Sequence, residues 1–261
     1  MRIQFHKYQG TGNDFVIIDN RKELYPLLSN EQVNFLCNRR FGIGADGLMM
    51  LNKHKAYDFE MVYFNADGRE GSMCGNGGRC LVKFASDMGL VKTTYHFIAV
   101  DGEHEASVHI DGTVALKMND VPRVKHENGR YILDTGSPHF IEMSNDVMRL
   151  DVAKKGREIR YSPRFEKEGI NVNFVEQRPD ADKIIVRTYE RGVEAETLSC
   201  GTGVTAAAIV SYHNDNGFNR VEVQTLGGHL SVEYDKVGDS FKNVWLNGPA
   251  QKVFEGVIEI D

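Results

Sequence analysis

Two short segments of the chain present a cysteine in nearly the same setting. The first reads MCGNGGRC (Met73 to Cys80) and the second reads SCGTGVTA (Ser199 to Ala206), so each contains Cys-Gly-x-Gly. Cys74 and Cys200 are 126 positions apart in a chain of 261 residues. If the chain is a duplicated fold, one thiol from each half could remove a proton from one face of a carbon, and the other could return a proton to the opposite face.

The environment predicted for these cysteines favours the thiolate, which is the form of cysteine that acts as a base. Helices are expected at about 78–88 and about 203–214, directly after the two cysteines. A helix N-terminus carries partial positive charge and unpaired N–H groups. The glycines of the two loops let the backbone approach a ligand closely, and the same N–H groups can hold a substrate carboxylate. Negative charge would then be stabilised as the neighbouring carbon loses its proton.

A structural role is the alternative for any single cysteine, because a free cysteine is usually a buried small hydrophobe. The repeated Cys-Gly-x-Gly setting favours catalysis for Cys74 and Cys200. Cys37 falls in a predicted amphipathic helix and Cys80 is expected to face away from the cleft, so both are interpreted as structural. No pair of the four cysteines has CxxC spacing, which argues against a zinc ribbon.

A second pair of segments supports an internal duplication. GTGNDFVIID (10–19) resembles DTGSPHFIEM (134–143) at an offset of 124. Two pairs at nearly one spacing favour a repeat, which would set the architecture. His139 occupies the repeat position of Phe15, and a structural role and a functional role both stay open for it. Glu190 and Arg191 are either a solvated pair or, in a cleft, groups that orient an amine and a carboxylate.

The remaining pattern predicts many short strands and few helices. Strands are expected at 3–8, 15–19, 59–65, 106–110, 114–118, 130–134, 171–175, 184–189, 221–224, 230–234 and 241–246. Further helices are expected at 31–38, capped by Ser29 or Asn30, and at 147–155. The helix after Cys200 is apolar nearly all round, so it should be buried on all sides, as inside a curled sheet. The boundary between the halves is expected at 117–121, and the final FEGVIEI segment should return to complete the first half.

Composition narrows the possible functions. The chain is 41% hydrophobic with a net charge of −6, which fits a soluble globular protein and makes nucleic acid an unexpected partner. Neither a membrane span nor a signal peptide is recognisable, so we expect a cytoplasmic protein with reduced thiols. GTGNDF lacks the third glycine of a dinucleotide site, and no P-loop lysine is present.

GTGNDF, FNADG, MCGNGGRC, NVNF, YERG and SCGTG, in this order, resemble the diaminopimelate epimerase family over essentially the whole chain. The resemblance implies an α/β (α+β) fold of two pseudo-symmetric domains, each a β-barrel-like sheet around a central helix. Residues 1–118, completed by a strand at 250–261, would form the domain that carries Cys74. Residues 119–249 would form the domain that carries Cys200.

The resemblance also implies an activity. It is the interconversion of LL- and meso-2,6-diaminopimelate in lysine and cell-wall precursor biosynthesis, by a cytoplasmic homodimer that uses neither pyridoxal phosphate nor metal. Cys74 and Cys200 match the two acid/base cysteines, and His139 and Glu190 match residues that assist them. Nine positions match substrate contacts: Asn13, Asn65, Gly75, Asn76, Asn171, Glu190, Arg191, Gly201 and Thr202. Of these, Asn65, Asn171 and Arg191 match residues that grip the distal, non-reacting end of the substrate.

Two departures from the family pattern concern substrate contacts. Ser137 stands where many members have asparagine, and Gly47 stands where some have glutamine. Related alternatives are a proline racemase or hydroxyproline epimerase, which typically have histidine at the position of Asn76, and a phenazine-type isomerase, which lacks the cysteine pair. From another class, the chain could be a non-catalytic thiol redox sensor or a binding module.

Overall fold

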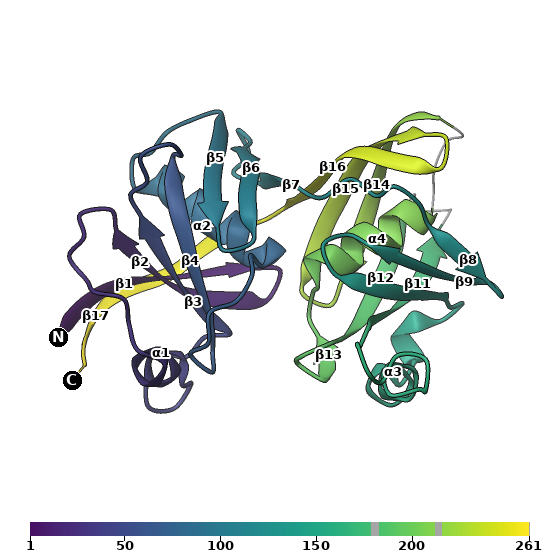
Figure 1. Cartoon of the computed structure of the whole chain (residues 1–261), viewed down its shortest axis with the longest axis horizontal. Helices are drawn as coiled ribbons and strands as arrows, with labels where there is room; N and C mark the ends of the chain where they lie inside the picture. Colours follow the sequence, from purple (N-terminus) through teal and green to yellow (C-terminus); the bar gives the residue numbers. More distant parts are fainter. Residues whose placement is uncertain (179–182, 212–215, 261) are drawn as a thin grey trace. The chain divides into compact units, whose positions relative to one another are not determined.

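The computed structural model describes residues 1–178, 183–211 and 216–260. The chain forms two compact units, one made of Met1–Leu116 with Gly248–Asp261 and the other of Lys117–Asn247 (Figure 1). Residues 212–214 of the predicted second helix, and residue 261 of the predicted last strand, lie outside the described residues. No helix in the described part of the chain is long and apolar enough to cross a membrane.

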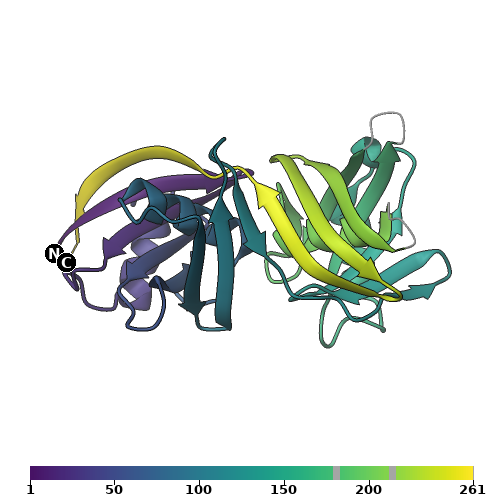
Figure 2. The same cartoon turned by 90° about the horizontal axis from the view of Figure 1, so that it is seen from above.

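The first unit is a sheet with a helix on each face. Its helices are α1 (Asn30–Cys37) and α2 (Gly75–Asp87). Its strands are β1 (Arg2–Gly10), β2 (Asn13–Asn20), β3 (Gly47–Asn52), β4 (Phe59–Asn65), β5 (Thr94–Ala99), β6 (Gly102–Val108), β7 (Val114–Lys117) and β17 (Gln251–Glu259). The C-terminal strand β17 pairs antiparallel along β1, so the first and last described segments of the chain lie side by side (Figures 1 and 2).

The second unit repeats this plan. Its helices are the 3₁₀ turn η1 (Val147–Arg149), α3 (Val152–Arg160) and α4 (Gly201–Ser211). Its strands are β8 (Lys125–Glu127), β9 (Arg130–Asp134), β10 (Pro138–Met143), β11 (Asn171–Arg178), β12 (Lys183–Glu190), β13 (Ala195–Thr197), β14 (Gly217–Thr225), β15 (Gly228–Val237) and β16 (Ser240–Gly248).

Strand pairing is the same in both units. In the first unit the neighbouring strands follow the order β17, β1, β2, β3, β4, β5, β6, β7. The pairs β2–β3 and β4–β5 are parallel, and the other five are antiparallel. In the second unit the order is β8, β9, β10, β11, β12, β14, β15, β16. The parallel pairs fall at the same two places, β10–β11 and β12–β14, and the other five pairs are antiparallel. A parallel pair needs a long crossover connection, and the parallel pairs β4–β5 and β12–β14 are the ones connected through α2 and α4.

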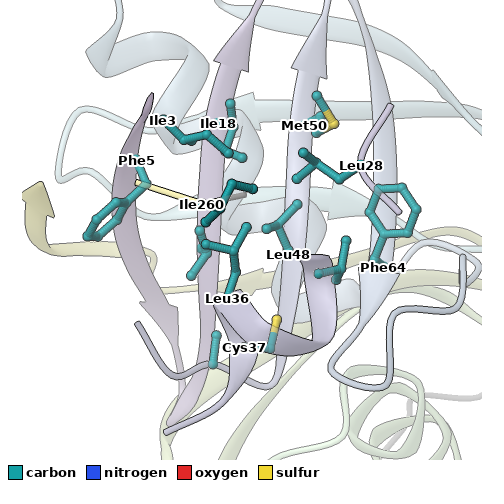
Figure 3. Packing of buried hydrophobic residues seen from close by; sticks show 13 residues of the cluster. Ile3, Phe5, Ile18, Leu28, Leu36, Cys37, Leu48, Met50, Phe64 and Ile260 are labelled. Carbon is teal, nitrogen blue, oxygen red and sulfur yellow. The ribbon is translucent and has the colours of Figure 1, made fainter. Parts of the chain in front are cut away.

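Alternation along β2 assigns the two faces of the first sheet, since successive side chains of a strand point to opposite sides. Val16 and Ile18 pack with α1 in an outer core that also contains Leu36 and Leu48 (Figure 3). Phe15 points the other way, toward Gly77 of α2. The sheet of the first unit is therefore covered on both faces.

The expected buried helix in the second half is confirmed. In α4, nine residues including every one from Gly203 to Val210 are buried, and the helix contacts β9, β10, β11, β12, β14 and β15. On the other face of this sheet, α3 packs over a second core that contains Phe140, Val172 and Phe174.

Several predicted boundaries are wrong. The helix expected at 147–155 is split at Leu150, because the Asp151 side chain accepts a hydrogen bond from Lys154 N at 3.0 Å and caps a new helix that continues to Arg160. The strand expected at 106–110 ends at Val108, where a turn joins His109 to Thr113. The prediction also missed β3, β5, β8, β10 and β13.

Candidate active site

Cys74 and Cys200 stand immediately before the inner helices of the two units. Cys74 is the N-cap of α2, with extended backbone angles, and its carbonyl accepts from Gly78 N at 2.7 Å. The Cys200 carbonyl accepts from Val204 N at 2.8 Å, directly before α4. Both helices begin earlier than predicted, so the loop glycines Gly75 and Gly201 are the first helical residues. Each thiol therefore lies where N–H groups and the helix dipole favour negative charge.

Asn13 connects the first cysteine to its surroundings. Its Oδ1 lies 3.7 Å from the Cys74 sulfur and accepts from Asn76 Nδ2 at 3.3 Å. Its Nδ2 donates to the carboxylate of Asp46. Three sequence-predicted positions, Asn13, Cys74 and Asn76, are thus brought together in the first unit.

Two residues at this site were not predicted from the sequence. The Thr11 hydroxyl lies 3.4 Å from Asn76 Oδ1, and the guanidinium of Arg79 donates to the same Asn76 oxygen at 2.9 Å. The signal for Thr11 was present, because Thr-Gly recurs as Thr135-Gly136 in the second copy. Thr135 donates to the Thr202 carbonyl at 2.9 Å, so both units tie the turn after the first strand of the repeat to the cysteine loop.

Asn65 lies at the exposed end of β4, where its Oδ1 accepts from the Tyr63 hydroxyl at 3.2 Å. Tyr63 also occupies the space beside Gly47. A Cβ at Gly47 would lie 2.6 Å from the Tyr63 ring and 2.7 Å from the Phe64 carbonyl. A glutamine at position 47, as expected in some relatives, does not fit this backbone unless both the Tyr63 ring and the Phe64 carbonyl move.

Asn171 is the centre of a polar group in the second unit. Its Nδ2 donates to Ser137 Oγ at 2.8 Å and to the Pro138 carbonyl at 3.2 Å, and its Oδ1 accepts from Arg191 N at 2.9 Å. The side chain of Arg191 is exposed and reaches the Glu168 carbonyl at 3.1 Å. Ser137 therefore keeps a hydrogen bond to Asn171 despite lacking an amide.

Glu190 is the last residue of β12. The residue before it, Tyr189, is paired with Val172, which follows Asn171 on β11. The Oε2 of Glu190 accepts from the Thr197 hydroxyl at 2.9 Å. This bond holds the carboxylate on β12 beside β13, the short strand that leads toward Cys200. The cysteine sulfur itself lies 3.5 Å from the hydroxyl of Thr202.

His139 is fully buried and electrically neutral. Burial, with the positive charge of Arg191 as a smaller cause, lowers the pKa of His139 to about 3. Its Nδ1 accepts from Asn173 Nδ2 at 3.0 Å, which places the ring proton on Nε2. Nε2 makes no hydrogen bond within the described residues.

Asn173 is a further residue that the sequence analysis missed. Its Oδ1 accepts from the Thr188 hydroxyl at 2.8 Å. The same oxygen would lie 2.3 Å from a Cβ at Gly203, so only glycine fits at this position of α4. NVNF carries this second asparagine two residues after Asn171, on the same face of β11. Among the described residues, no group of three or more His, Cys, Asp or Glu side chains is placed to hold a metal ion.

The fold places the chain in a class of proteins built from two such units. A phenazine biosynthesis protein of the PhzF family from Bacillus anthracis has a similar structure, with a TM-score of 0.77 at 16% identity over 100% of both chains. A probable proline racemase from Agrobacterium radiobacter K84 has a TM-score of 0.71 at 15% identity, over 99% of this chain and 93% of that chain. At this identity the likeness concerns the fold, an α/β architecture with extensive sheet, as predicted.

The family follows from closer comparisons. The diaminopimelate epimerase family model matches residues 5–124 and 131–253. A diaminopimelate epimerase of Flavobacterium psychrophilum is 44% identical over 98% of this chain and 100% of its own length. That of Aquifex aeolicus is 40% identical over 97% of both. The chain belongs to the diaminopimelate epimerase family and is an isomerase, which confirms the resemblance seen in its motifs.

Proposed function

We propose that the chain interconverts LL- and meso-2,6-diaminopimelate by moving a proton between Cys74 and Cys200 through the α-carbon of the substrate. The observation that carries the two-cysteine assignment is that each cysteine immediately precedes the buried helix of its unit. In this proposal residues 1–118 with 250–261 form one catalytic domain and residues 119–249 form the other. The reaction uses no pyridoxal phosphate and no metal.

The proposed reaction conserves protons. One cysteine, as the thiolate, takes the α-proton and becomes a thiol, while the C–H electron pair stays on the substrate. The other cysteine, as the thiol, gives its proton to the opposite face and becomes the thiolate. The N–H groups of the Gly75-Asn76 and Gly201-Thr202 loops hold the reacting carboxylate and stabilise the charge that develops beside it.

The remaining positions are proposed to bind and support. The exposed guanidinium of Arg191 suits the distal carboxylate of the substrate, which it can bind in a bidentate manner, and Asn65 and Asn171 grip the same end. Asn13 contacts the substrate beside Cys74. Neutral His139 and the carboxylate of Glu190 assist proton transfer at the cysteines.

Two further parts of the proposal concern the protein as a whole. We propose a homodimer, as the family resemblance implies. We also propose a cytoplasmic location, because all four cysteines are free and a reducing compartment keeps thiols in that state. Size-exclusion chromatography with light scattering tests the first point, and fractionation of cells tests the second.

Substitution of one cysteine at a time, assayed in heavy water, tests the mechanism. Cys74→Ala and Cys200→Ala should each lower epimerisation by about 10³-fold or more, because an acid/base group is lost. Exchange of the α-proton for deuterium should persist from the face of the remaining cysteine. Cys37→Ala is the matched control, since Cys37 is the last residue of α1 and packs in the outer core, and it should retain activity.

Three outcomes would contradict the proposal. Full epimerase activity in Cys200→Ala would exclude the two-base mechanism. Turnover of proline in place of diaminopimelate would support the racemase alternative. Absence of deuterium from every amino acid offered to the wild-type protein would favour a redox sensor or a binding module.

A further inference from the structure

Arg79 is a buried cation in the first turns of α2. The residue is completely inaccessible to solvent. Its guanidinium donates to three neutral oxygens, at 2.9 Å to Asn76 Oδ1, 3.3 Å to Thr11 Oγ1 and 3.3 Å to the Gly75 carbonyl. Within the described residues its Nε has no partner and the side chain makes no ion pair with a carboxylate.

A buried charge without a counter-ion is strongly unfavourable. Burial lowers the pKa of Arg79, yet a guanidinium stays protonated in proteins. The partial positive charge of the α2 N-terminus adds to that of Arg79. An anion close to the N-terminus of α2 would therefore stabilise this buried positive charge.

Two thiols are the candidate anions on the same helix. Cys80 is completely buried, and burial raises its pKa to about 12, so it stays neutral. Cys74 is only half-buried, and it is connected to Arg79 through the hydrogen bonds of Asn76 and Asn13. Of the two thiols, Cys74 is the one that can carry the negative charge.

Other charged groups around α2 have partners of their own. Asp46, which holds Asn13, pairs with Arg39 at 2.8 Å. Asp101, which accepts from Met73 N at 3.2 Å, contacts His104 on β6. Further ionisable groups lie toward the C-terminal end of this helix. They are Arg21, which donates to the Met88 carbonyl at 3.2 Å, and the cluster of His6, Tyr8, Lys83, Asp87 and Glu255.

The equivalent position of α4 carries no charge. Thr205 stands there, and its hydroxyl donates to the Gly201 carbonyl at 3.0 Å, just as Arg79 donates to the Gly75 carbonyl. The helix dipole acts on both cysteines, but α2 adds the guanidinium of Arg79 to it, whereas α4 carries no charged residue from Gly201 to Ser211. The two thiols are therefore unlike in their electrostatic surroundings.

We propose that Arg79 is a positioning residue that keeps Cys74 as the resting thiolate, while Cys200 rests as the thiol. The catalytic meaning of this assignment depends on the function proposed above. One contact opposes it, since Asn13 Oδ1 faces the Cys74 sulfur at 3.7 Å and favours an S–H donor. That contact is a weak hydrogen bond, whereas a unit charge in a poorly hydrated interior acts more strongly over several ångströms.

The pH dependence of iodoacetamide alkylation, followed by mass spectrometry, tests the proposal in a Cys200→Ala background. The midpoint of Cys74 alkylation should lie below the ordinary thiol value of about 8.5. Arg79→Gln should raise this midpoint by about one pH unit or more, a change of about tenfold in thiolate at neutral pH. Arg79→Lys should restore part of the shift. Lys83→Gln, which removes a positive charge farther along α2, should leave it unchanged.

A second comparison tests the assignment of the two resting states if Arg79→Gln does not fold. With Arg79 intact, the alkylation midpoint of Cys74 in Cys200→Ala should lie below that of Cys200 in Cys74→Ala. Midpoints are compared instead of rates because Cys200 is more buried than Cys74. An equal or reversed order overturns the proposal, as does an unchanged midpoint in folded Arg79→Gln. Alkylation needs no substrate, so these results are independent of whether the chain epimerises diaminopimelate.

Discussion

The two units of this chain share a backbone plan and differ in the side chains attached to it. Parallel register places Phe15 opposite Gly47 in the first unit and His139 opposite Asn171 in the second. The first pair is apolar, while both members of the second are polar and form side-chain hydrogen bonds with other residues, His139 with Asn173 and Asn171 with Ser137. Strand order, pairing direction and the cysteine before the helix are kept. Duplication thus preserved the placement of the thiols and left their surroundings free to diverge.

The largest difference between the two units is expected at equivalent glycines of the helices α2 and α4. Gly203→Ala would place a Cβ 2.3 Å from Asn173 Oδ1, whereas at Gly77 the nearest atom is the flexible Met49 sulfur at 3.3 Å. We expect Gly203→Ala to lower the free energy of unfolding by about 3 kcal/mol and Gly77→Ala by under about 1 kcal/mol. Denaturant unfolding measures both, and equal losses would show that the helices are packed alike.

Asn171 provides the next test, because its repeat position in the first unit is a glycine. Asn171→Ala removes the acceptor of Arg191 N and the donor to Ser137, which should cost about 2 kcal/mol of stability. If Asn171 also holds the distal end of the substrate, KM should rise more than kcat falls. Asn34→Ala is a suitable control, since it removes an exposed side-chain bond to the Ala66 carbonyl away from the site.

His139→Phe gives the second unit the side chain that the first has at this position. The pKa of His139 is about 3 in the folded chain and about 6.5 when unfolded, so between these values the unfolded state binds more protons. Stability from neutral His139 is complete above about pH 6.5 and is lost as the pH falls toward 3. The variant should show a shallower loss of unfolding free energy over this range. Parallel curves for the two proteins would mean that His139 is not the group responsible.

The paired threonines provide the last test, and Thr135→Val is expected to have the smallest effect of all. Thr135→Val removes one hydrogen bond to a neutral carbonyl and should cost about 1 kcal/mol. Thr11→Val removes a bond from the Arg79 guanidinium and should cost about 2 kcal/mol, since bonds to charged groups are stronger. Thermal unfolding ranks the two variants, and a reversed ranking would indicate that Arg79 does not depend on Thr11.

The sequence predicted those parts of the fold that local pattern determines. Ser29 was expected to cap the first helix, and it forms a capping box with Gln32. The apolar helix after Cys200 was correctly expected to be buried. The strands β3 and β5 were missed because each takes its place through pairing with a distant strand, which local alternation does not reveal. The break at Leu150 was missed because the Asp151 cap competes with a continuous helical pattern.

At the site, motifs identified the cysteines and their loops, but not what surrounds them. The repeated Thr-Gly marked position 11, but the partners of Thr11 and Asn173 lie far away in sequence, so spacing alone could not show what these two residues hold. The burial of Arg79 was hidden for a related reason. From the sequence alone, an arginine in a glycine-rich segment is expected to be solvated. The burial of Arg79 is evident only from the packing of Thr11 and Asn76 around it.

The pairing of β17 with β1 has a consequence for synthesis. Ile260 N donates to the Met1 carbonyl at 2.8 Å, so the first unit is closed by a segment that is translated after the whole of the second unit. The second unit, which is continuous in sequence, can fold on the ribosome while the first still lacks an edge strand. Completion of the N-terminal unit therefore follows translation of the whole second unit.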